Sequence, residues 1–467
     1  MTATLEAPAA LCAGVPATAT DGLQVPVADG WIDYANFDHA ASTPALRSVA
    51  SAVERVVAGY GSVHRGNGHP SRVTSQWYDQ AREEVGRFVG ARATDHVVFT
   101  RNTTDSWTLL AHALPADTTV VAFASEHHST LLPWGAHRTV TLGVPATVAD
   151  GIRALDRALG EVTSRHSLVV VAGASNVTGD VWPIADIVAV AHRHGARVAL
   201  DAAQLAPHRR IDLAGWDVDY VALSGHKIYA PYGTGVLAGR GDWLDTAAPY
   251  LPGGGATVSV TESEVVWALG PARHEGGTPN VVGAVALAAA CAALAEHRAD
   301  IALYEHALGA RLRRGLAAIP GVRLHTLFGS GADQVAVVAF TVDGLEAGLV
   351  STALSVEYGI GVRDGRFCAH RLVDHLLGGD SGVAAGSGGS HGADTLHRSG
   401  MPSARLREVA AVRASLGLAT RPHHVERLIT AVTELAASGP ALSYVPSEAG
   451  WETPSVAAAT TSSSRLW

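Results

Sequence analysis

The chain has 467 residues, of which 47% are hydrophobic and 16% charged, and its formal net charge is −9. This length is enough for two or three domains with substantial hydrophobic cores. The negative charge and the absence of a Lys/Arg run argue against nucleic acid as the main partner. No stretch approaches the roughly 18 apolar residues that cross a bilayer, so we expect no membrane segment.

The cysteines and the N-terminal region narrow the class of protein further. Cys12, Cys291 and Cys368 lie far apart and outside any Cys-x-x-Cys pattern, which excludes a disulfide scaffold and a zinc knuckle. We therefore expect no metal site and a cytoplasmic location. Residues 1–30 are rich in Ala, Pro and Thr and lack Lys and Arg, which predicts a flexible leader rather than a secretory signal.

One residue type is almost missing from the chain. Of the 34 Lys and Arg residues, only Lys227 is a lysine. The codon bias of a GC-rich genome can explain this scarcity, but not why the one lysine follows Ser224-Gly225-His226. A guanidinium stays protonated and is a poor carbonyl nucleophile, whereas a lysine amine can lose its proton. Lys227 is therefore a candidate for chemistry that needs an amine.

From about residue 35 to residue 298, short β-rich runs alternate with amphipathic helices. We predict strands at residues 96–100, 119–124, 168–172, 197–200 and 220–223. The apolar spacing of residues 184–194, closed by Gly195, predicts a helix between the third and fourth strands. This order makes a βαβ unit, so we expect an α/β domain with a mainly parallel sheet over residues 31–298.

After residue 298 the pattern predicts a smaller α+β domain over residues 299–447. It contains an expected helix at 301–319, a strand at 335–341, a further helix, a strand at 361–363 and a last helix at 424–437. A Gly/Ser-rich insert at residues 377–400 has no periodic run and predicts a flexible loop. Residues 448–467 are expected to form a disordered tail.

Polar clusters follow the five predicted strands of the larger domain. They are Asn102-Thr103-Thr104, Glu126-His127-His128, Ser175-Asn176, Asp201 to Gln204, and Ser224 to Lys227. In α/β sheets, ligands bind beyond the carboxyl ends of the strands. We therefore expect these clusters to form one binding site.

The residue types in these clusters are those that pyridoxal 5′-phosphate (PLP) requires of a protein. Lys227 can form a Schiff base, and Asp201 can keep the pyridine nitrogen protonated. Thr103 and Thr104 open a helix whose N–H groups can cradle a phosphate, and His127 can lie over the ring. Taken singly, these residues are also typical of helix caps, a solvated loop lysine and a structural histidine. Their combination predicts a PLP site.

Nine short stretches, spread over roughly residues 33–437, together form a recognisable pattern. They are Phe37-Asp-His-Ala-Ala-Ser-Thr-Pro, Ser62-Val-His-Arg-Gly, Glu126-His-His-Ser-Thr-Leu-Leu-Pro-Trp, Ser175-Asn-Val-Thr-Gly, Asp201-Ala-Ala-Gln, Ser224-Gly-His-Lys, Glu275-Gly-Gly-Thr-Pro-Asn, Gly361-Val-Arg and Arg413-Ala-Ser-Leu. In this order they resemble the cysteine desulfurase/selenocysteine lyase family of the class V aminotransferases, particularly its SUF-type branch. The pair Asp-Ala-Ala-Gln and Ser-Gly-His-Lys is the most specific part of the resemblance.

The resemblance implies a PLP-dependent transferase of fold type I that is a homodimer with a shared active site. The implied catalytic residues are Lys227, Cys368 and His127. The implied cofactor contacts are Thr103, Thr104, His127, Asn176, Asp201, Gln204, Ser224, His226, Lys227 and, from the other subunit, Thr278. The implied substrate contacts are Asn176, Arg363 and Arg413.

The sequence departs from the family around the position of Cys368. The family usually has asparagine where Thr130 stands, and commonly a His-His pair where this chain has Arg366-Phe367. The segment between Cys368 and Arg413 is also longer than usual. The cofactor site is therefore nearly intact, whereas the region that handles the departing sulfur is altered.

The interpretation that follows is a cysteine desulfurase or selenocysteine lyase acting on a small amino acid. Lys227 would hold the cofactor, and Cys368 would take the sulfur as a persulfide and pass it to an acceptor protein. One alternative is a PLP enzyme of the same fold with other chemistry, namely a C–S lyase or an epimerase- or aminotransferase-like tailoring enzyme. Another is a non-catalytic sulfur carrier or scaffold protein with a degenerate site, against which the set of Asp201, Lys227 and Arg413 argues. A Rossmann dehydrogenase fits less well, since no G-x-G-x-x-G follows the first strand.

Overall fold

The computed structural model describes residues 14–64, 66–329, 331–378, 409–447 and 450–454. Most of the insert expected as a flexible loop, and residues 1–13 and 455–467, lie outside these ranges. Within them, no single helix is both long and apolar enough to span a membrane. Among the described residues, one pair of helices, α9 (Val281–Glu296) and α10 (Arg298–Ala317), has the necessary length and composition together, but it is bent by 77°.

The larger domain is built on a seven-stranded sheet with the strand order β4-β10-β9-β8-β7-β5-β6. All neighbours are parallel except β10, which runs antiparallel to β4 and β9. This confirms the mainly parallel sheet and all five predicted strands; β6 and β10 were not predicted. The strands are β4 (Asp95–Thr100), β5 (Thr118–Phe123), β6 (Arg138–Leu142), β7 (His166–Ala172), β8 (Arg197–Asp201), β9 (Tyr220–Ser224) and β10 (Gly235–Arg240).

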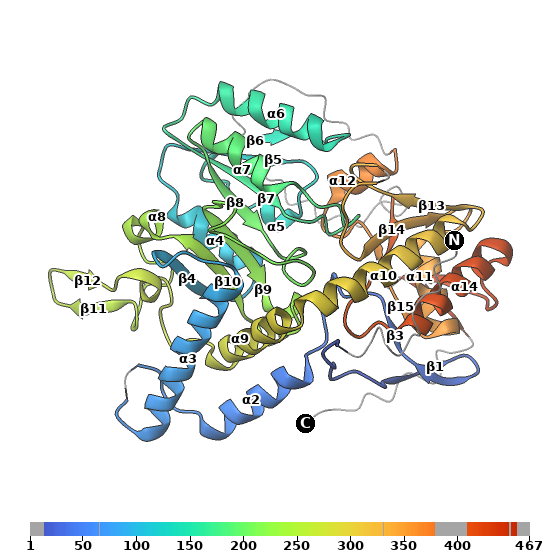
Figure 1. Cartoon of the computed structure of the whole chain (residues 1–467), viewed down its shortest axis with the longest axis horizontal. Helices are drawn as coiled ribbons and strands as arrows, with labels where there is room; N and C mark the ends of the chain where they lie inside the picture. The colour runs from blue at the N-terminus through green and yellow to red at the C-terminus, as the bar shows by residue number, and fades with distance from the viewer. Residues whose placement is uncertain (1–13, 65, 330, 379–408, 448–449, 455–467) are drawn as a thin grey trace.

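Helices cover both faces of this sheet (Figure 1). Along β7, Val169 and Val171 pack into one hydrophobic core, whereas Leu168 and Val170 pack into the core on the other face. Successive side chains of β7 point to opposite faces of the sheet, and both faces are buried. The strand is therefore a continuous run of apolar residues in the sequence. The helices of this domain are α2 (Arg47–Gly59), α3 (His69–Phe88), α4 (Thr103–Ala113), α5 (His128–Leu131), α6 (Val148–Glu161), α7 (Ile184–Arg193), α8 (Gly241–Thr246) and α9 (Val281–Glu296).

The smaller domain contains the antiparallel sheet β13-β14-β17-β16. Its strands are β13 (Val322–His325), β14 (Val337–Val342), β16 (Arg363–Gly365) and β17 (Ala411–Ser415). The helices are α10 (Arg298–Ala317), α11 (Ala347–Tyr358), α12 (His370–Leu376) and α14 (Pro422–Ser438). Both predicted long helices are confirmed, but the strand predicted at 361–363 is two short strands, β15 (Ile360–Gly361) and β16.

The N-terminal segment belongs to the smaller domain, which corrects two predictions. Residues 14–30, expected to be flexible, include β1 (Gln24–Val27), which pairs with β2 (Gly30–Asp33). Residues 31–37, expected in the larger domain, continue through β3 (Ala35–Asn36), which pairs with β15. The side chain of Phe37 is buried in the core of the smaller domain. These strands are too short to show a period of two, so their pairing was not visible in the sequence.

The end of the described chain is also more ordered than predicted. β18 (Val445–Ser447) pairs with β19 (Gly450–Glu452), and Thr453 is buried. A Cβ atom at Gly348 of α11 would lie 3.3 Å from Cδ1 of Trp451, so β19 packs closely on that helix. The prediction of a disordered tail from residue 448 is therefore wrong for residues 450–454.

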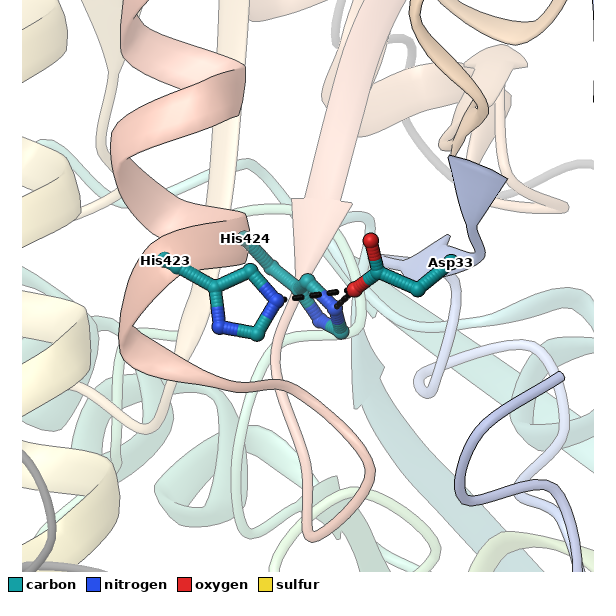
Figure 2. A group of neighbouring side chains, drawn as sticks. All are labelled: Asp33, His423 and His424. Carbon is teal, nitrogen blue, oxygen red and sulfur yellow. Dashed lines mark hydrogen bonds and ion pairs between the residues drawn. The ribbon is translucent and has the colours of Figure 1, made fainter. Parts of the chain in front are cut away.

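A charged cluster fastens β2 to the start of α14 (Figure 2). One carboxylate oxygen of Asp33 lies 2.8 Å from Nε2 of His423 and 2.7 Å from Nε2 of His424, and Nη2 of Arg427 donates to the other oxygen at 2.6 Å. Although partial burial alone would raise the pKa of Asp33, the three hydrogen bonds lower it well below its usual range. The cluster therefore holds the N-terminal hairpin against the smaller domain as a network of ionic hydrogen bonds.

Two histidines beside a carboxylate also resemble a metal-binding set, but the tautomer of His424 opposes that function. Its Nδ1 accepts a hydrogen bond from the backbone N–H of Arg421, 3.1 Å away, as part of the cap of α14. Burial lowers the pKa of His424 to about 4, so the ring is neutral and its proton lies on Nε2. Nε2 then donates to Asp33 and has no lone pair for a metal ion.

We predict that Asp33→Ala lowers the free energy of unfolding by roughly 1–2 kcal/mol at neutral pH, because ionic hydrogen bonds are lost from a carboxylate that solvent partly screens. Chemical denaturation monitored by circular dichroism measures this difference. Asp29→Ala, at an exposed turn position of the same hairpin, is the matched control and should leave stability unchanged. Equal stabilities for the two variants would contradict the fastening role of the cluster.

Candidate active site

A cavity of about 370 Å³ lies at the carboxyl ends of the parallel strands, where the sequence predicted a site. This volume is in the range of small-molecule sites. Every site residue named from the sequence lines it, apart from Thr278. That residue is exposed in the loop between β12 (Val265–Trp267) and α9. The predicted residues that line the cavity are Thr103, Thr104, His127, Asn176, Asp201, Gln204, Ser224, His226, Lys227, Arg363, Cys368 and Arg413.

Lys227 lies in the short helix η1 (Gly225–Lys227), which directly follows β9. Desolvation in the cavity lowers the pKa of Lys227 to about 8, while the nearby Asp201 carboxylate acts in the opposite direction. The amine therefore loses its proton far more readily than an exposed lysine. It can act as a nucleophile or as a base near neutral pH.

Asp201 ends β8 and is held on both of its carboxylate oxygens. The hydroxyl of Thr130 donates to Oδ2 at 2.8 Å, and the backbone N–H of Ala203 donates to Oδ1 at 2.9 Å. The side chain is buried and faces the same cavity as Lys227. Thr130, which sequence reasoning noted only as a departure from the family, thus fixes the orientation of the carboxylate.

The start of α4 and the end of β9 meet in a cluster of hydroxyl and N–H groups. Oγ of Ser224 accepts from the backbone N–H of Thr103 at 2.8 Å and lies 2.8 Å from its hydroxyl oxygen. A Cβ atom at Gly235 would lie 2.5 Å from Cα of Asn102, so this position needs glycine for β10 to approach the loop. The free N–H groups of a helix N-terminus with adjacent hydroxyls can bind a phosphate.

His127 precedes α5 and is fixed by a local hydrogen bond. Its Nδ1 accepts from the backbone N–H of Ser129 at 3.1 Å, and the Ser129 hydroxyl lies 2.8 Å away. Burial lowers the pKa of His127 to about 4, and the positive charge of Lys227 acts in the same direction. The ring is therefore neutral, and it presents a flat face suited to stacking on an aromatic ligand.

Two arginines from the smaller domain form the opposite wall. Arg363 of β16 and Arg413 of β17 are cross-strand partners, so their side chains leave the sheet on the same face. Arg413 is almost fully buried, and Nη1 donates to the backbone oxygen of Asn176 at 2.9 Å. Within the described ranges, its Nε has no hydrogen-bond partner. A buried cation with an unused donor is suited to an anionic ligand.

Cys368 lies at the rim of the cavity on a loop with unusual backbone geometry. Phe367 and Cys368 have φ values of 52° and 53°, in the left-handed region that non-glycine residues rarely adopt. Two hydrogen bonds of 2.8 Å hold this conformation, one from Nδ2 of Asn176 to the oxygen of Phe367 and one from the backbone N–H of His128 to the oxygen of Cys368. The exposed thiol thus has a defined position between cavity and solvent.

The residues present fit PLP on observations of this structure alone. The site combines a lysine of lowered pKa, a buried and oriented carboxylate, a helix N-terminus with hydroxyls, and a buried guanidinium with an unused N–H. Sequence reasoning missed Asp38, which contacts both arginines, and the function of Thr130. The signal for Asp38 was present in the stretch Phe37-Asp-His, but nothing local indicated its partners, which are 325 and 375 positions away.

Comparison with known proteins gives the family of the chain. Residues 35–428 match the family model Aminotransferase class-V. The chain is 36% identical over 327 residues to a cysteine desulfurase of Cronobacter sakazakii, which covers 68% of this chain and 79% of that protein. It is also 36% identical over 351 residues to a probable cysteine desulfurase of Mycolicibacterium paratuberculosis, 73% of this chain but 50% of that longer protein.

Solved structures give the same result. The fold is similar to that of the cysteine desulfurase CsdA from Escherichia coli, with a TM-score of 0.71 and 27% identity over 92% of this chain and 98% of that one. It is similar to the apo cysteine desulfurase of Thermococcus onnurineus, with a TM-score of 0.73 and 27% identity over 86% and 95% of the two chains. The chain therefore belongs to the class-V aminotransferase family, among relatives that are cysteine desulfurases, and is a PLP-dependent enzyme of fold type I.

Proposed function

We propose that this protein is a cysteine desulfurase or selenocysteine lyase that removes sulfur or selenium from an amino acid. The observation that carries the proposal is that Lys227, Asp201, Arg413 and Cys368 line one cavity. The cysteine desulfurases among the relatives support the same chemistry. A cavity that held only the cofactor residues would favour a more general PLP enzyme.

The cofactor contacts follow from the donors and acceptors around the cavity. Thr103, Thr104, Ser224 and His226 would bind the phosphate, and Thr278 of a second subunit would complete that contact. Asp201 would pair with the ring nitrogen, Gln204 with the ring hydroxyl, and His127 would stack on the ring. When bound, PLP supplies an electron sink that stabilises negative charge on Cα of an amino acid.

Lys227 would carry out the proton transfers. It would hold the cofactor through its amine, and its neutral Nζ would take the α-proton of the amino acid and later return it. The lowered pKa supports this function because a base must be unprotonated before it can act. Asn176 and Arg413 would bind the substrate carboxylate, with Arg363 beside them.

Cys368 would act as the sulfur acceptor. Its thiolate would attack Sγ of the substrate, and the electron pair of the broken Cβ–Sγ bond would pass to Cβ, which takes up a proton. The products would be alanine and a persulfide on Cys368. Because the thiol is exposed at the rim, the persulfide can be presented to an acceptor protein. The hydrogen bonds to the backbone oxygens of Phe367 and Cys368 hold the loop in one conformation, which supports a defined position of the thiol beside the cavity.

An exposed apolar hairpin supports the homodimer. Strands β11 (Thr257–Val260) and β12 project from the larger domain at the edge of the molecule (Figure 1). Val258 and Val260 are 71% and 65% exposed on this hairpin, and Leu269 just after it is 80% exposed. Large exposed apolar side chains grouped in this way are typical of a contact surface. Thr278 follows the hairpin, so a second subunit bound here would bring the two sites together.

We predict that the purified protein is yellow and that borohydride reduction fixes the chromophore to the peptide containing Lys227. Lys227→Ala should abolish this fixation, because no other lysine exists and only the α-amine of the chain remains. Absorbance spectra and peptide mapping by mass spectrometry test this. A reduced adduct that survives at another position in Lys227→Ala would falsify the cofactor assignment.

We predict that Lys227 in the cofactor-free protein is acylated with a pH midpoint of about 8, rather than the value of about 10.4 for a free lysine. Since the Asp201 charge raises the lysine pKa, Asp201→Asn should move the midpoint to lower pH. Mass spectrometry of the Lys227 peptide after brief acylation separates this amine from the α-amine. A midpoint near 10 would contradict a desolvated lysine.

We predict that Cys368→Ser keeps the yellow cofactor and the spectral response to L-cysteine but releases no alanine. Cys291→Ala is the control and should release alanine as the parent does, since that thiol is fully buried in the core and does not line the cavity. Amino-acid analysis of the reaction products measures alanine and pyruvate. Parental turnover in Cys368→Ser, with pyruvate as product, would favour the C–S lyase alternative.

A further inference from the structure

The carboxylate of Asp38 bridges the two arginines of the cavity wall. Nη2 of Arg413 donates to Oδ1 at 3.1 Å. Nη2 and Nε of Arg363 both donate to Oδ2, at 2.8 and 3.1 Å. Asp38 is therefore the one group among the described residues that forms hydrogen bonds to both guanidinium groups.

The position of Asp38 is fixed by its own backbone. Its N–H donates to Oδ1 of Asn36 at 2.9 Å, and Ala41 N–H donates to its carbonyl at 3.1 Å. Asp38 also forms an isolated parallel bridge with Ser415, two residues after Arg413 on β17. The backbone of Asp38 is thus joined to β17, the strand that carries Arg413.

The charges around Asp38 do not cancel. Among the groups joined by these hydrogen bonds, one carboxylate serves two guanidinium groups, so the hydrogen-bonded set carries one excess positive charge. Arg413 is buried, and desolvation lowers its pKa to about 10, while Asp38 acts in the opposite direction. Arg413 retains an unused Nε, and its guanidinium lies 5.0 Å from the centre of the Phe367 ring. One further carboxylate would satisfy the remaining donor and charge.

We propose that Asp38 is a positioning residue that orients Arg413 and Arg363 to receive the carboxylate of the amino-acid substrate. The proposal rests on the proposed function in that it assumes an amino-acid ligand. Hydrogen bonds to Asp38 are the only ones that the Arg363 side chain forms in the described part of the chain, and this side chain is half-exposed. Without Asp38, Arg363 turns to solvent, and Arg413 keeps a single acceptor, the backbone oxygen of Asn176. The loss of orientation outweighs the gain in net positive charge, because solvent screens a mobile surface cation.

The test compares two ligands that differ only in the carboxylate. Dissociation constants of L-alanine and ethylamine are measured on the cofactor-loaded protein from the change in visible absorbance. Asp38→Ala should weaken the binding of L-alanine about 10-fold and leave the binding of ethylamine unchanged. Asp364→Ala, an exposed carboxylate next to Arg363, is the matched control and should change neither constant.

A double-mutant comparison separates positioning from a general structural effect. In an Arg413→Ala background, Asp38→Ala should weaken the binding of L-alanine less than it does in the parent protein, because only Arg363 is left for Asp38 to orient. Equal losses for both ligands, additive effects of the two substitutions, or tighter binding of L-alanine would each overturn the proposal. Absence of sulfur transfer would contradict the proposed function instead, since these binding constants require neither Cys368 nor turnover.

Discussion

The cavity depends above all on the parallel pairing of β5, β7, β8 and β9. Parallel strands end at a common edge, and the register places Asp201 beside Ala172 of β7 and Ala222 of β9. The residues that directly follow these strands are therefore neighbours in space. His127 and Lys227, for example, line the same cavity although they are 100 positions apart in the chain. A base, a carboxylate and a flat ring meet because one backbone arrangement brings strand ends together.

The remaining wall requires the second domain and the start of the chain. Antiparallel pairing of β16 with β17 sets Arg363 opposite Arg413, and the bridge from Asp38 to Ser415 fastens the N-terminal segment to the same strand. This explains why residues 31–37 pack with the smaller domain. The segment that ends at Asp38 supplies the negative charge between the two arginines, so it has to pack beside β16 and β17, the strands that carry them.

The sequence was most informative where chemistry and periodicity coincide. Lys227 and Asp201 were predictable because each stands at the end of a strongly apolar strand and because the lysine is unique. The functions of Asp38 and Thr130 could not be predicted, because the residues they bind are distant in the chain and their hydrogen bonds depend on tertiary structure. The short strands β1, β3 and β19 were missed for a related reason: two to four residues contain too little pattern to distinguish a strand from a loop.

The departures from the family acquire a physical explanation in the structure. A threonine replaces the usual asparagine at position 130, but its hydroxyl supplies one donor, and that donor binds Asp201 at 2.8 Å. Arg366 replaces a histidine before Cys368, and it forms an ion pair with Asp374 of α12. The arginine thus ties the cysteine loop to the following helix, whereas an imidazole would be free to take up or release a proton. The altered residues therefore affect how the loop that carries Cys368 is held, and they leave the predicted cofactor residues in one cavity.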